Sequence, residues 1–292
     1  MKSCLECKSS FTSPGWACPV CGYEPVRLDG FVAHAPALAH EGGGFKAEYF
    51  QELAALEESN FWFRARNALI LWALRTFKPE STSFLEVGCG TGFVLSGIAC
   101  NNPGITVSGS EIFLSGLPYA ASRVSSAEFM QMDARHIPFV EEFDAIGSFD
   151  VLEHIEQDEL VLNQMSRALK PGGLLLLTVP QHSWLWSAAD EYACHVRRYG
   201  REEMQEKVRR AGFSILRTTS FVSLLLPAML LSRKKKSQSI ESPEYDPAQE
   251  LRISGVLNAC LLAIMRFESV LIRLGLNFPI GGSRLVVAKK LS

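Results

Sequence analysis

Three glycines at alternate positions form the first group of residues in this chain that could bind a ligand. Gly88, Gly90 and Gly92 follow Glu86 in the segment FLEVGCGTG, directly after a short apolar run. Glycine tolerates positive φ angles and lets a ligand come close to the backbone, so such a turn can hold a nucleotide where a strand gives way to a helix. The segment therefore predicts a nucleotide-binding turn, with Cys89 inside it.

Acidic side chains follow at the ends of the next apolar runs. Glu111, next to Ile112, comes 19 residues after the last glycine of the turn, where a carboxylate can accept both hydroxyls of a ribose. Asp133, next to Ala134, ends FMQMDA, where a carboxylate can accept a hydrogen bond from an adenine amino group. Asp150 lies just beyond the following run. Because the carboxyl ends of parallel strands meet along one crevice, we expect these acids to line a single nucleotide site.

A candidate general base stands next to these acids. The segment SFDVLEHIEQ places Glu153 and His154 at the exit of a predicted strand. His154 is the candidate catalytic base, because the unperturbed pKa of histidine lies near neutrality. The alternative is structural: the Glu-His pair would only anchor the helix that follows.

Two further polar segments could contact a substrate. DEYACHVRRYGREEM contains His195, Arg197, Arg198 and Tyr199, residue types that suit a phosphate, a carboxylate or a polyhydroxylated sugar. A turn that starts a helix, with arginines bound to backbone groups, is the alternative. FWFRARN adds the candidate substrate residues Trp62 and Arg66, although aromatic residues at this density are also typical of a core.

Four cysteines near the N-terminus have the spacing of a metal site. Cys4, Cys7, Cys18 and Cys21 follow C-x2-C-x10-C-x2-C, which can supply the tetrahedral sulfur ligands of a structural Zn²⁺. A redox pair would need a βαβ context, which these residues lack. The first 27 residues carry three cations against two acids, so we expect a zinc ribbon that does not bind nucleic acid.

The elements that must position these residues alternate between strand and helix patterns. Seven runs predict strands: Phe84–Val87, Thr106–Ser110, Glu128–Met132, Asp144–Phe149, Leu174–Val179, Phe213–Thr218 and Arg284–Ala288. Such alternation is typical of a parallel sheet covered by helices. We therefore predict an α/β fold with a seven-stranded, doubly wound, mostly parallel sheet. Its predicted parts are a zinc ribbon at 1–24, a linker at 25–44, two helices at 45–80 and a main domain at 81–292, with a helical insertion at about 221–280.

The glycine turn resembles motif I of class I S-adenosylmethionine-dependent methyltransferases. A nicotinamide dinucleotide fold would place its third glycine at position 93, where Phe93 stands. The resemblance continues through LKPGG and covers roughly residues 84–219 plus the final strand. It implies that the three glycines line the methionine portion of the cofactor, that Glu86 holds its amino group, that Glu111 binds the ribose, and that Asp133 with Ala134 binds the adenine. Cys89, Ile112 and Asp150 complete the predicted cofactor site.

The resemblance implies methyl transfer, to an oxygen of a small-molecule, glycan or lipid-linked acceptor. The pattern D-x-L-E-H also looks like that of ubiquinone-biosynthesis O-methyltransferases, where a divalent metal can sit nearby. The ribbon, the FWF-R-x-R-N helix and the H-x-R-R-Y loop together resemble an uncharacterised bacterial subgroup of the family. Three alternatives stay open: N-methylation, an RNA methyltransferase that uses the ribbon to hold nucleic acid, and a non-catalytic adaptor.

Charge and hydropathy limit the partners. The net charge of −2 gives no global attraction to nucleic acid, and the opening residues lack the apolar stretch of a signal peptide, so we expect a cytoplasmic protein. FVSLLLPAMLLSRKKK joins an apolar stretch to four cations, and an apolar helix follows at 251–275. We expect residues 221–275 to form a lid or a homodimer interface, with a peripheral membrane contact and additional core as the alternatives.

Overall fold

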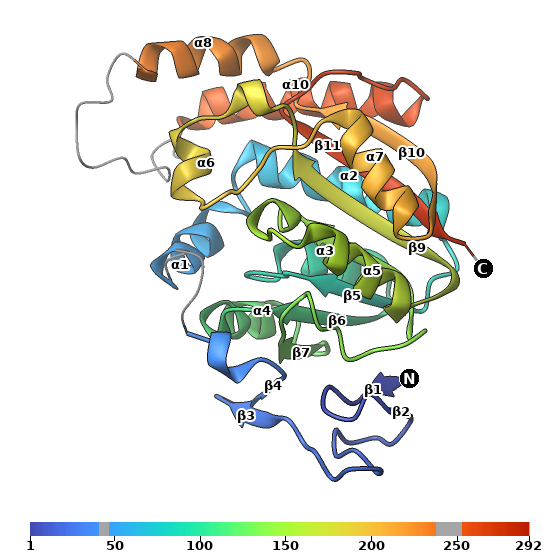
Figure 1. Ribbon diagram of the computed structural model, residues 1–292. Coiled ribbons are helices and arrows are strands. Elements are labelled where there is room, and N and C mark those ends of the chain that lie inside the picture. Colours follow the sequence, from blue (N-terminus) through green and yellow to red (C-terminus); the bar gives the residue numbers. More distant parts are fainter. Residues whose placement is uncertain (41–46, 238–252, 292) are drawn as a thin grey trace.

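A nine-stranded sheet forms the centre of the protein (Figure 1). The computed structural model describes residues 1–40, 47–237 and 253–291. The strand order is β10-β11-β9-β8-β5-β6-β7-β4-β3. The strands are β3 (Val26–Leu28), β4 (Phe31–Ala33), β5 (Ser83–Val87), β6 (Thr106–Glu111), β7 (Glu128–Gln131), β8 (Phe143–Phe149), β9 (Leu169–Pro180), β10 (Phe213–Phe221) and β11 (Ser283–Lys290).

All seven predicted strands are present, as β5 to β11, and the predicted α/β class is confirmed. Strands β5 to β9 pair in parallel with their neighbours, whereas β11 lies antiparallel between β9 and β10. The parallel strands therefore end at one edge of the sheet. That edge carries Glu86, Glu111 and Asp150 at or just beyond the ends of their strands.

The sheet has two more strands than predicted, because part of the predicted linker at 25–44 joins it. Strand β4 pairs in parallel with β7 and antiparallel with β3, and the short helix η1 (Pro36–Leu38) follows. The edge of β7 would otherwise leave backbone groups unpaired. Gln131 on β7 adds side-chain hydrogen bonds to the N–H and the carbonyl oxygen of Ala35, at 3.0 and 2.9 Å. The hairpin turn is Asp29-Gly30, a dipeptide typical of such turns, and both residues have positive φ angles.

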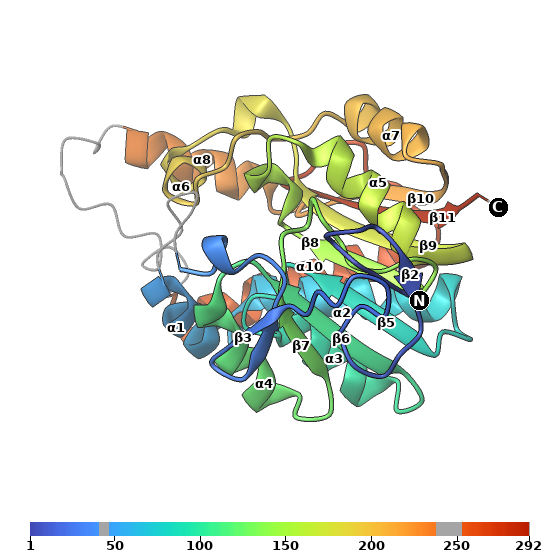
Figure 2. The ribbon, with the colours of Figure 1, turned by 60° about the horizontal axis from the view of Figure 1, so that its bottom comes forward.

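Helices cover both faces of the sheet, as Figure 2 shows. The helices are α1 (Ala47–Leu56), α2 (Phe61–Phe77), α3 (Phe93–Asn101), α4 (Leu117–Arg123), α5 (Asp158–Ala168), α6 (Ala188–Tyr192), α7 (Arg201–Arg210), α8 (Leu226–Ser237) and α10 (Gly255–Arg273). One core cluster joins α2, α3, α4 and α10 to the sheet, and the other joins α5 and α7. Leu174 and Leu176 of β9 belong to the first cluster and Leu175 and Leu177 to the second, the alternation expected of a strand buried on both faces.

The cysteine-rich N-terminal segment packs directly on the main domain. Its strands β1 (Lys2–Ser3) and β2 (Ser10–Phe11) form a separate two-stranded sheet. The Ser3 N–H donates to the carbonyl oxygen of Pro138 at 2.9 Å, and Trp16 is buried with its ring centroid 5.5 Å from that of Phe139. The ribbon segment is thus joined to the core rather than tethered to it by a linker.

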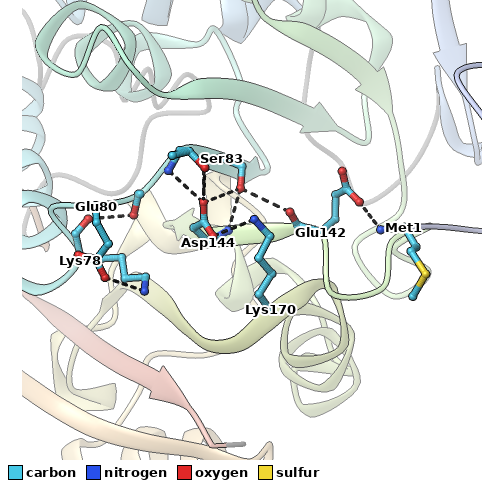
Figure 3. Close-up of polar contacts among 9 residues, drawn as sticks. Met1, Lys78, Glu80, Ser83, Glu142, Asp144 and Lys170 are labelled. Atoms are coloured by element: carbon cyan, nitrogen blue, oxygen red, sulfur yellow. Dashed lines mark hydrogen bonds and ion pairs between the residues drawn. The ribbon is translucent and has the colours of Figure 1, made fainter. Parts of the chain in front are cut away.

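A polar cluster fixes the opposite, amino-terminal edge of the parallel strands (Figure 3). Asp144 at the start of β8 accepts hydrogen bonds from the backbone N–H groups of Thr82 and Ser83 at 3.0 and 3.1 Å, and from Lys170 Nζ at 2.9 Å. Partial burial acts to raise the pKa of Asp144, but these donors hold it well below the usual range. The cluster aligns β5 with β8 far from the candidate site.

The predicted insertion consists of α8, α10 and the residues between them. Glu268 of α10 is buried and accepts hydrogen bonds from the N–H groups of Ser223 and Leu224, both at 2.7 Å, so the start of α8 is fixed to α10. By length and composition, α10 is apolar enough to cross a membrane, with 28% of its most apolar window buried. Residues 238–252, and the side chains of the basic run at 233–236, lie outside what the structure describes.

Candidate cofactor and acceptor site

A cavity of about 1220 Å³ lies at the carboxyl ends of the parallel strands. It brings together most of the residues that the sequence singled out. The predicted residues that line it are Glu86, Gly88, Cys89, Gly90, Glu111, Ile112, Asp133, Ala134, Asp150, His154, Trp62, Arg66, His195 and Arg198.

The glycine turn divides into ligand-facing and packing positions. A side chain at Gly90 would meet only Phe50, at 3.8 Å, so this position leaves open space on the cavity side. Gly92 has a φ angle of 75°, and a Cβ atom there would lie 2.8 Å from the Cα atom of Ala120. Gly92 does not line the cavity, which corrects its predicted contact with the cofactor. Its absent side chain instead lets α3 begin against α4.

Glu86 lines the cavity from the end of β5. Its side chain is buried, and within the described part of the chain its Oε2 atom has no hydrogen-bond partner. Burial raises the pKa of Glu86 well above its usual value, and the nearby charge of Arg66 offsets only part of that rise. A buried carboxylate oxygen without a partner is costly to maintain. A cationic donor bound in the cavity would relieve that cost.

Glu111 and Asp133 already accept hydrogen bonds from the protein. Glu111 accepts from the N–H of Gly90 at 3.0 Å and from the N–H of Ile112 at 2.9 Å, which joins the end of β6 to the glycine turn. Burial raises the pKa of Glu111, although these amide donors act to lower it. Asp133 pairs with Arg135, whose Nε lies 3.0 Å from each carboxylate oxygen. Two carboxylate oxygens offer about four acceptor sites. Glu111 accepts from three backbone N–H groups and retains a site for a ligand, whereas Asp133 makes four contacts with Arg135, so a ligand there would replace one of them.

Arg66 and Asp150, predicted for different ligands, form an ion pair with each other. The guanidinium of Arg66 binds Asp150 Oδ2, which also accepts from Thr178 Oγ1 at 3.2 Å. The Arg66 guanidinium carbon also lies 4.4 Å from the ring centroid of Trp62. Arg66 comes from α2 and Asp150 from the end of β8, so this pair holds α2 across the sheet edge.

Two histidines and two acids form a cluster at another part of the cavity wall. His195 Nδ1 lies 2.9 Å from Asp190 Oδ1, and its Nε2 lies 3.9 Å from Glu153 Oε1. The rings of His154 and His195 meet edge to face, with centroids 4.8 Å apart. Ligand atoms of Glu153, His154 and His195 all lie within 4.8 Å of one another. Such a group can hold a divalent cation or transfer a proton.

Burial sets the protonation states in this cluster. It lowers the pKa of His154 to about 4, with a further contribution from the charge of His195. It raises the pKa of Glu153 well above the usual value, and in the described chain neither Glu153 oxygen has a hydrogen-bond partner. Burial also acts to raise the pKa of Asp190, but His195 and Arg198 hold it at about 2. At neutral pH, His154 is therefore neutral and Asp190 is charged.

Two predicted substrate residues do not reach the cavity. The Tyr199 side chain is fully buried, and its hydroxyl donates to Asp158 Oδ2 at 2.7 Å. Arg197 Nη1 lies 2.7 Å from the same carboxylate oxygen, and Lys207 Nζ lies 2.6 Å from it. A buried carboxylate requires such partners. Arg197 and Tyr199 therefore stabilise the start of α5, which corrects their predicted role, whereas His195 and Arg198 do line the cavity.

Glu57 lines the cavity, although its sequence context does not predict this position. It is buried just after α1 and accepts from Thr91 Oγ1 and Arg123 Nη1, both at 2.5 Å. These contacts tie the α1–α2 turn to the glycine turn. In the sequence, Glu57 stands in the polar run LEESN, which gave no signal of burial.

The four N-terminal cysteines converge as predicted. All four sulfur atoms lie within 4.8 Å of one another, with Cys4 to Cys21 at 3.6 Å and Cys7 to Cys18 at 3.7 Å. Two sulfurs of a tetrahedral site with bonds of about 2.3 Å are about 3.8 Å apart. The cluster is therefore compatible with zinc binding.

Comparisons with known proteins agree with this site. Residues 85–177 match a family model described as a methyltransferase domain. A protein of Mycolicibacterium smegmatis named as a probable S-adenosylmethionine-dependent methyltransferase is 26% identical over 173 residues, 56% of this chain and 63% of that protein. A ubiquinone biosynthesis O-methyltransferase of Dechloromonas aromatica is 34% identical over 115 residues, 37% of this chain and 48% of that protein. The chain thus spans less than two thirds of the length of these curated relatives.

Solved structures share the fold at low sequence identity. A chain from a Haloferax volcanii complex with the Trm112 methyltransferase activator has a TM-score of 0.56 and 18% identity, over 83% of this chain and 98% of that one. Phosphoethanolamine N-methyltransferase 2 of Haemonchus contortus was solved with S-adenosyl-L-methionine. Its TM-score is 0.52 and its identity 22%, over 76% of this chain and 52% of that one. The [4+2]-cyclase SpnF has a TM-score of 0.53 and 21% identity, over 79% of this chain and 82% of that one. Because a cyclase shares the fold, the fold alone does not define the reaction.

The matched methyltransferase domain and the relatives named as S-adenosylmethionine-dependent methyltransferases support an enzyme that uses this cofactor. The residues of the cavity fit that cofactor. The Glu86 oxygen without a hydrogen-bond partner suits the amino group of the cofactor. The open space beside Gly90 lets the cofactor come close to the backbone.

Proposed function

We propose that this protein transfers the methyl group of S-adenosylmethionine to an oxygen atom of an acceptor bound beside His195. One observation carries the proposal: a single cavity joins the glycine turn and Glu86, whose Oε2 atom has no hydrogen-bond partner among the described residues, to His195 with its partner Asp190. When bound, the cofactor supplies a methyl group already activated on a sulfonium. The protein then needs to orient the acceptor and to accept its proton.

The cofactor would occupy the part of the cavity next to β5, β6 and β7. Glu86 would accept a hydrogen bond from its amino group, Glu111 would accept from the ribose and Asp133 from the adenine. Glu111 is already oriented for this role by the N–H groups of Gly90 and Ile112.

His195 is a better candidate base than His154. The low pKa of His154 makes it a weak proton acceptor at neutral pH. His195 donates from Nδ1 to the charged Asp190, which leaves Nε2 free to accept a proton and stabilises the imidazolium that forms. In this account, His195 Nε2 takes the proton of the acceptor hydroxyl. His154 packs against the His195 ring and limits its rotation.

Methyl transfer from labelled S-adenosylmethionine tests this function. The acceptors are a panel of phenols, sugars and hydroxylated lipids, each paired with its methyl ether, and a matched set of amines. We expect label in at least one hydroxylated acceptor and none in its methyl ether. Label only in amines would contradict oxygen as the target, and absence of both cofactor binding and transfer would favour the adaptor alternative.

We also propose that the four cysteines bind a structural Zn²⁺. The sulfur distances support this, and so does the small size of the ribbon core, which consists of Cys4, Phe11 and Cys18 with Tyr23 packed against them. Segments of this size rarely fold without a metal or cross-links. Metal analysis of the purified protein tests the proposal, and we expect one zinc per chain, lost in Cys4→Ser/Cys18→Ser.

A further inference from the structure

The outward face of α10 carries a continuous apolar stripe. Val256, Cys260, Ala263, Phe267, Val270 and Leu274 are all exposed and alternate at intervals of four and three residues. Val256 is 79% exposed, Phe267 59% and Leu274 80%. We call these six residues the α10 stripe. Exposed apolar residues that lie together on one helix face mark an interaction surface.

The stripe is held in place by the opposite face of the helix. Leu262, Met265 and Ile272 are buried in the core cluster that contains α2. Asn258 accepts from the N–H of Phe61 at 2.8 Å and donates to the carbonyl oxygen of Ser59 at 2.9 Å. The helix therefore cannot turn its stripe inward. It also cannot cross a bilayer without breaking these contacts, so it would lie along a surface.

The charges beside the stripe identify the kind of partner. Arg266 and Arg273 are exposed on α10, whereas Glu268, the one carboxylate among described residues 253–280, is buried and satisfied by the start of α8. The exposed charges of the helix are thus all positive. A second copy of the stripe would add two more arginines and no exposed carboxylate from residues 253–280, so it offers these cations no partner. An anionic surface complements both the cations and the stripe.

The apolar surface continues into the cavity. Leu257 of α10 is 48% exposed and also lines the cavity, together with Leu261 of α10 and Met229 of α8. Leu224, just before α8, and Leu231, within α8, are exposed as well. His154 and His195 line the same cavity. An acceptor with an apolar chain could therefore lie between α8 and α10 with its polar end near the histidines.

We propose that the α10 stripe docks on an anionic lipid bilayer surface and that the cavity takes an amphiphilic acceptor, with an apolar chain, from that surface. The identity of the acceptor class rests on the proposed function. The docking does not, because it needs neither cofactor nor turnover.

Vesicle sedimentation of the full chain tests the docking. One set of vesicles contains equal parts of phosphatidylglycerol and phosphatidylcholine, and the other contains phosphatidylcholine alone. We expect at least about tenfold stronger partitioning onto the anionic vesicles, weakened by salt. Phe267→Asp/Leu274→Asp should reduce partitioning at least about tenfold. Leu291→Asp, at a 56% exposed leucine outside the stripe, should leave it unchanged.

Two results would overturn the docking proposal: no partitioning onto anionic vesicles, or equal partitioning of Phe267→Asp/Leu274→Asp with an intact thermal transition. If ultracentrifugation shows dimers that this variant loses while vesicles bind nothing, the occupant is a second copy. Calorimetry with S-adenosylmethionine on the same proteins separates the claims. Cofactor binding without vesicle binding contradicts only the docking proposal. Vesicle binding without cofactor binding contradicts only the proposed methyl transfer.

Discussion

Glu86 links cofactor binding to pH. Its pKa is raised by burial, so part of the free protein carries a protonated Glu86 at pH values where an exposed glutamate is ionised. A cationic ligand stabilises the ionised form and lowers that pKa, so binding releases a proton. The affinity for S-adenosylmethionine should therefore rise with pH until the pH exceeds the pKa of the free protein. Calorimetry in two buffers of different ionisation enthalpy measures the release. The same release in Glu86→Gln would contradict this assignment.

The two histidines should differ in their kinetic effects. We expect His195→Gln to lower kcat by about 10²–10⁴, the range of general base catalysis, with little change in cofactor affinity. His154→Gln should cost much less, because its lowered pKa already makes it a weak base. Single-turnover rates and cofactor calorimetry on both variants make the comparison. A larger loss of kcat in His154→Gln would restore the assignment made from the sequence.

At the residue scale, the sequence predicted most of the side chains that line the cavity beside β5, β6 and β7, but not all of those near His195. Glu86, Glu111 and Asp133 were predictable because parallel strands end at one edge, which fixes where their last side chains lie. Arg197 and Tyr199 were not, since a loop sequence does not reveal which way each side chain points. Their direction depends on Asp158, whose burial against α7 is a tertiary contact.

At the element scale, the strands of the main domain were predictable from their apolar runs, and the β3–β4 hairpin was not. Each of its strands has three residues, too few to show an alternating pattern. Its stability comes from pairing with β7 and from the Gln131 contacts to Ala35. Only the Asp29-Gly30 turn signalled it locally.

Asp144 should stabilise the β5–β8 pairing in a pH-dependent way. The pKa of Asp144 in the folded protein lies below the usual range. Its contribution to the free energy of unfolding is therefore fully present above its pKa in the unfolded chain, about 3.9, and is lost as the pH falls through its pKa in the folded protein. We expect Asp144→Asn to cost roughly 1–3 kcal/mol of unfolding free energy at pH 7, and less at pH 3.5. Urea unfolding at both pH values measures the difference. An equal loss at both would show that charge is not involved.

At the scale of the whole molecule, the ribbon and the insertion lie at opposite ends of the sheet (Figure 1). The ribbon packs beside the loop between β7 and β8, and the insertion packs beside β10. The position of the insertion next to the cavity gives it a route to influence the acceptor, whereas the ribbon stabilises the far edge. The sequence identified both parts but not their placement, which depends on long-range contacts such as Trp16 with Phe139.

Zinc removal should destabilise the molecule without abolishing the cofactor site. Chelation should unfold the ribbon and expose Trp16, because a metal bound by the four cysteines would provide most of the folding energy of so small a segment. We expect a lower thermal midpoint and a red-shifted fluorescence component that is absent in Trp16→Phe. Cofactor affinity, measured well below that midpoint, should change little. An unaltered midpoint after zinc is removed would argue against a structural metal.

Binding of S-adenosylmethionine to the zinc-loaded protein tests the central claim most directly. Isothermal titration calorimetry compares the unaltered chain with Glu111→Ala, which removes the carboxylate joined to the N–H groups of Gly90 and Ile112, and with Leu291→Asp as the matched surface control. We expect micromolar binding by the unaltered chain and the control, and its loss in Glu111→Ala. Absence of binding by the unaltered chain, or full binding by Glu111→Ala, would contradict it.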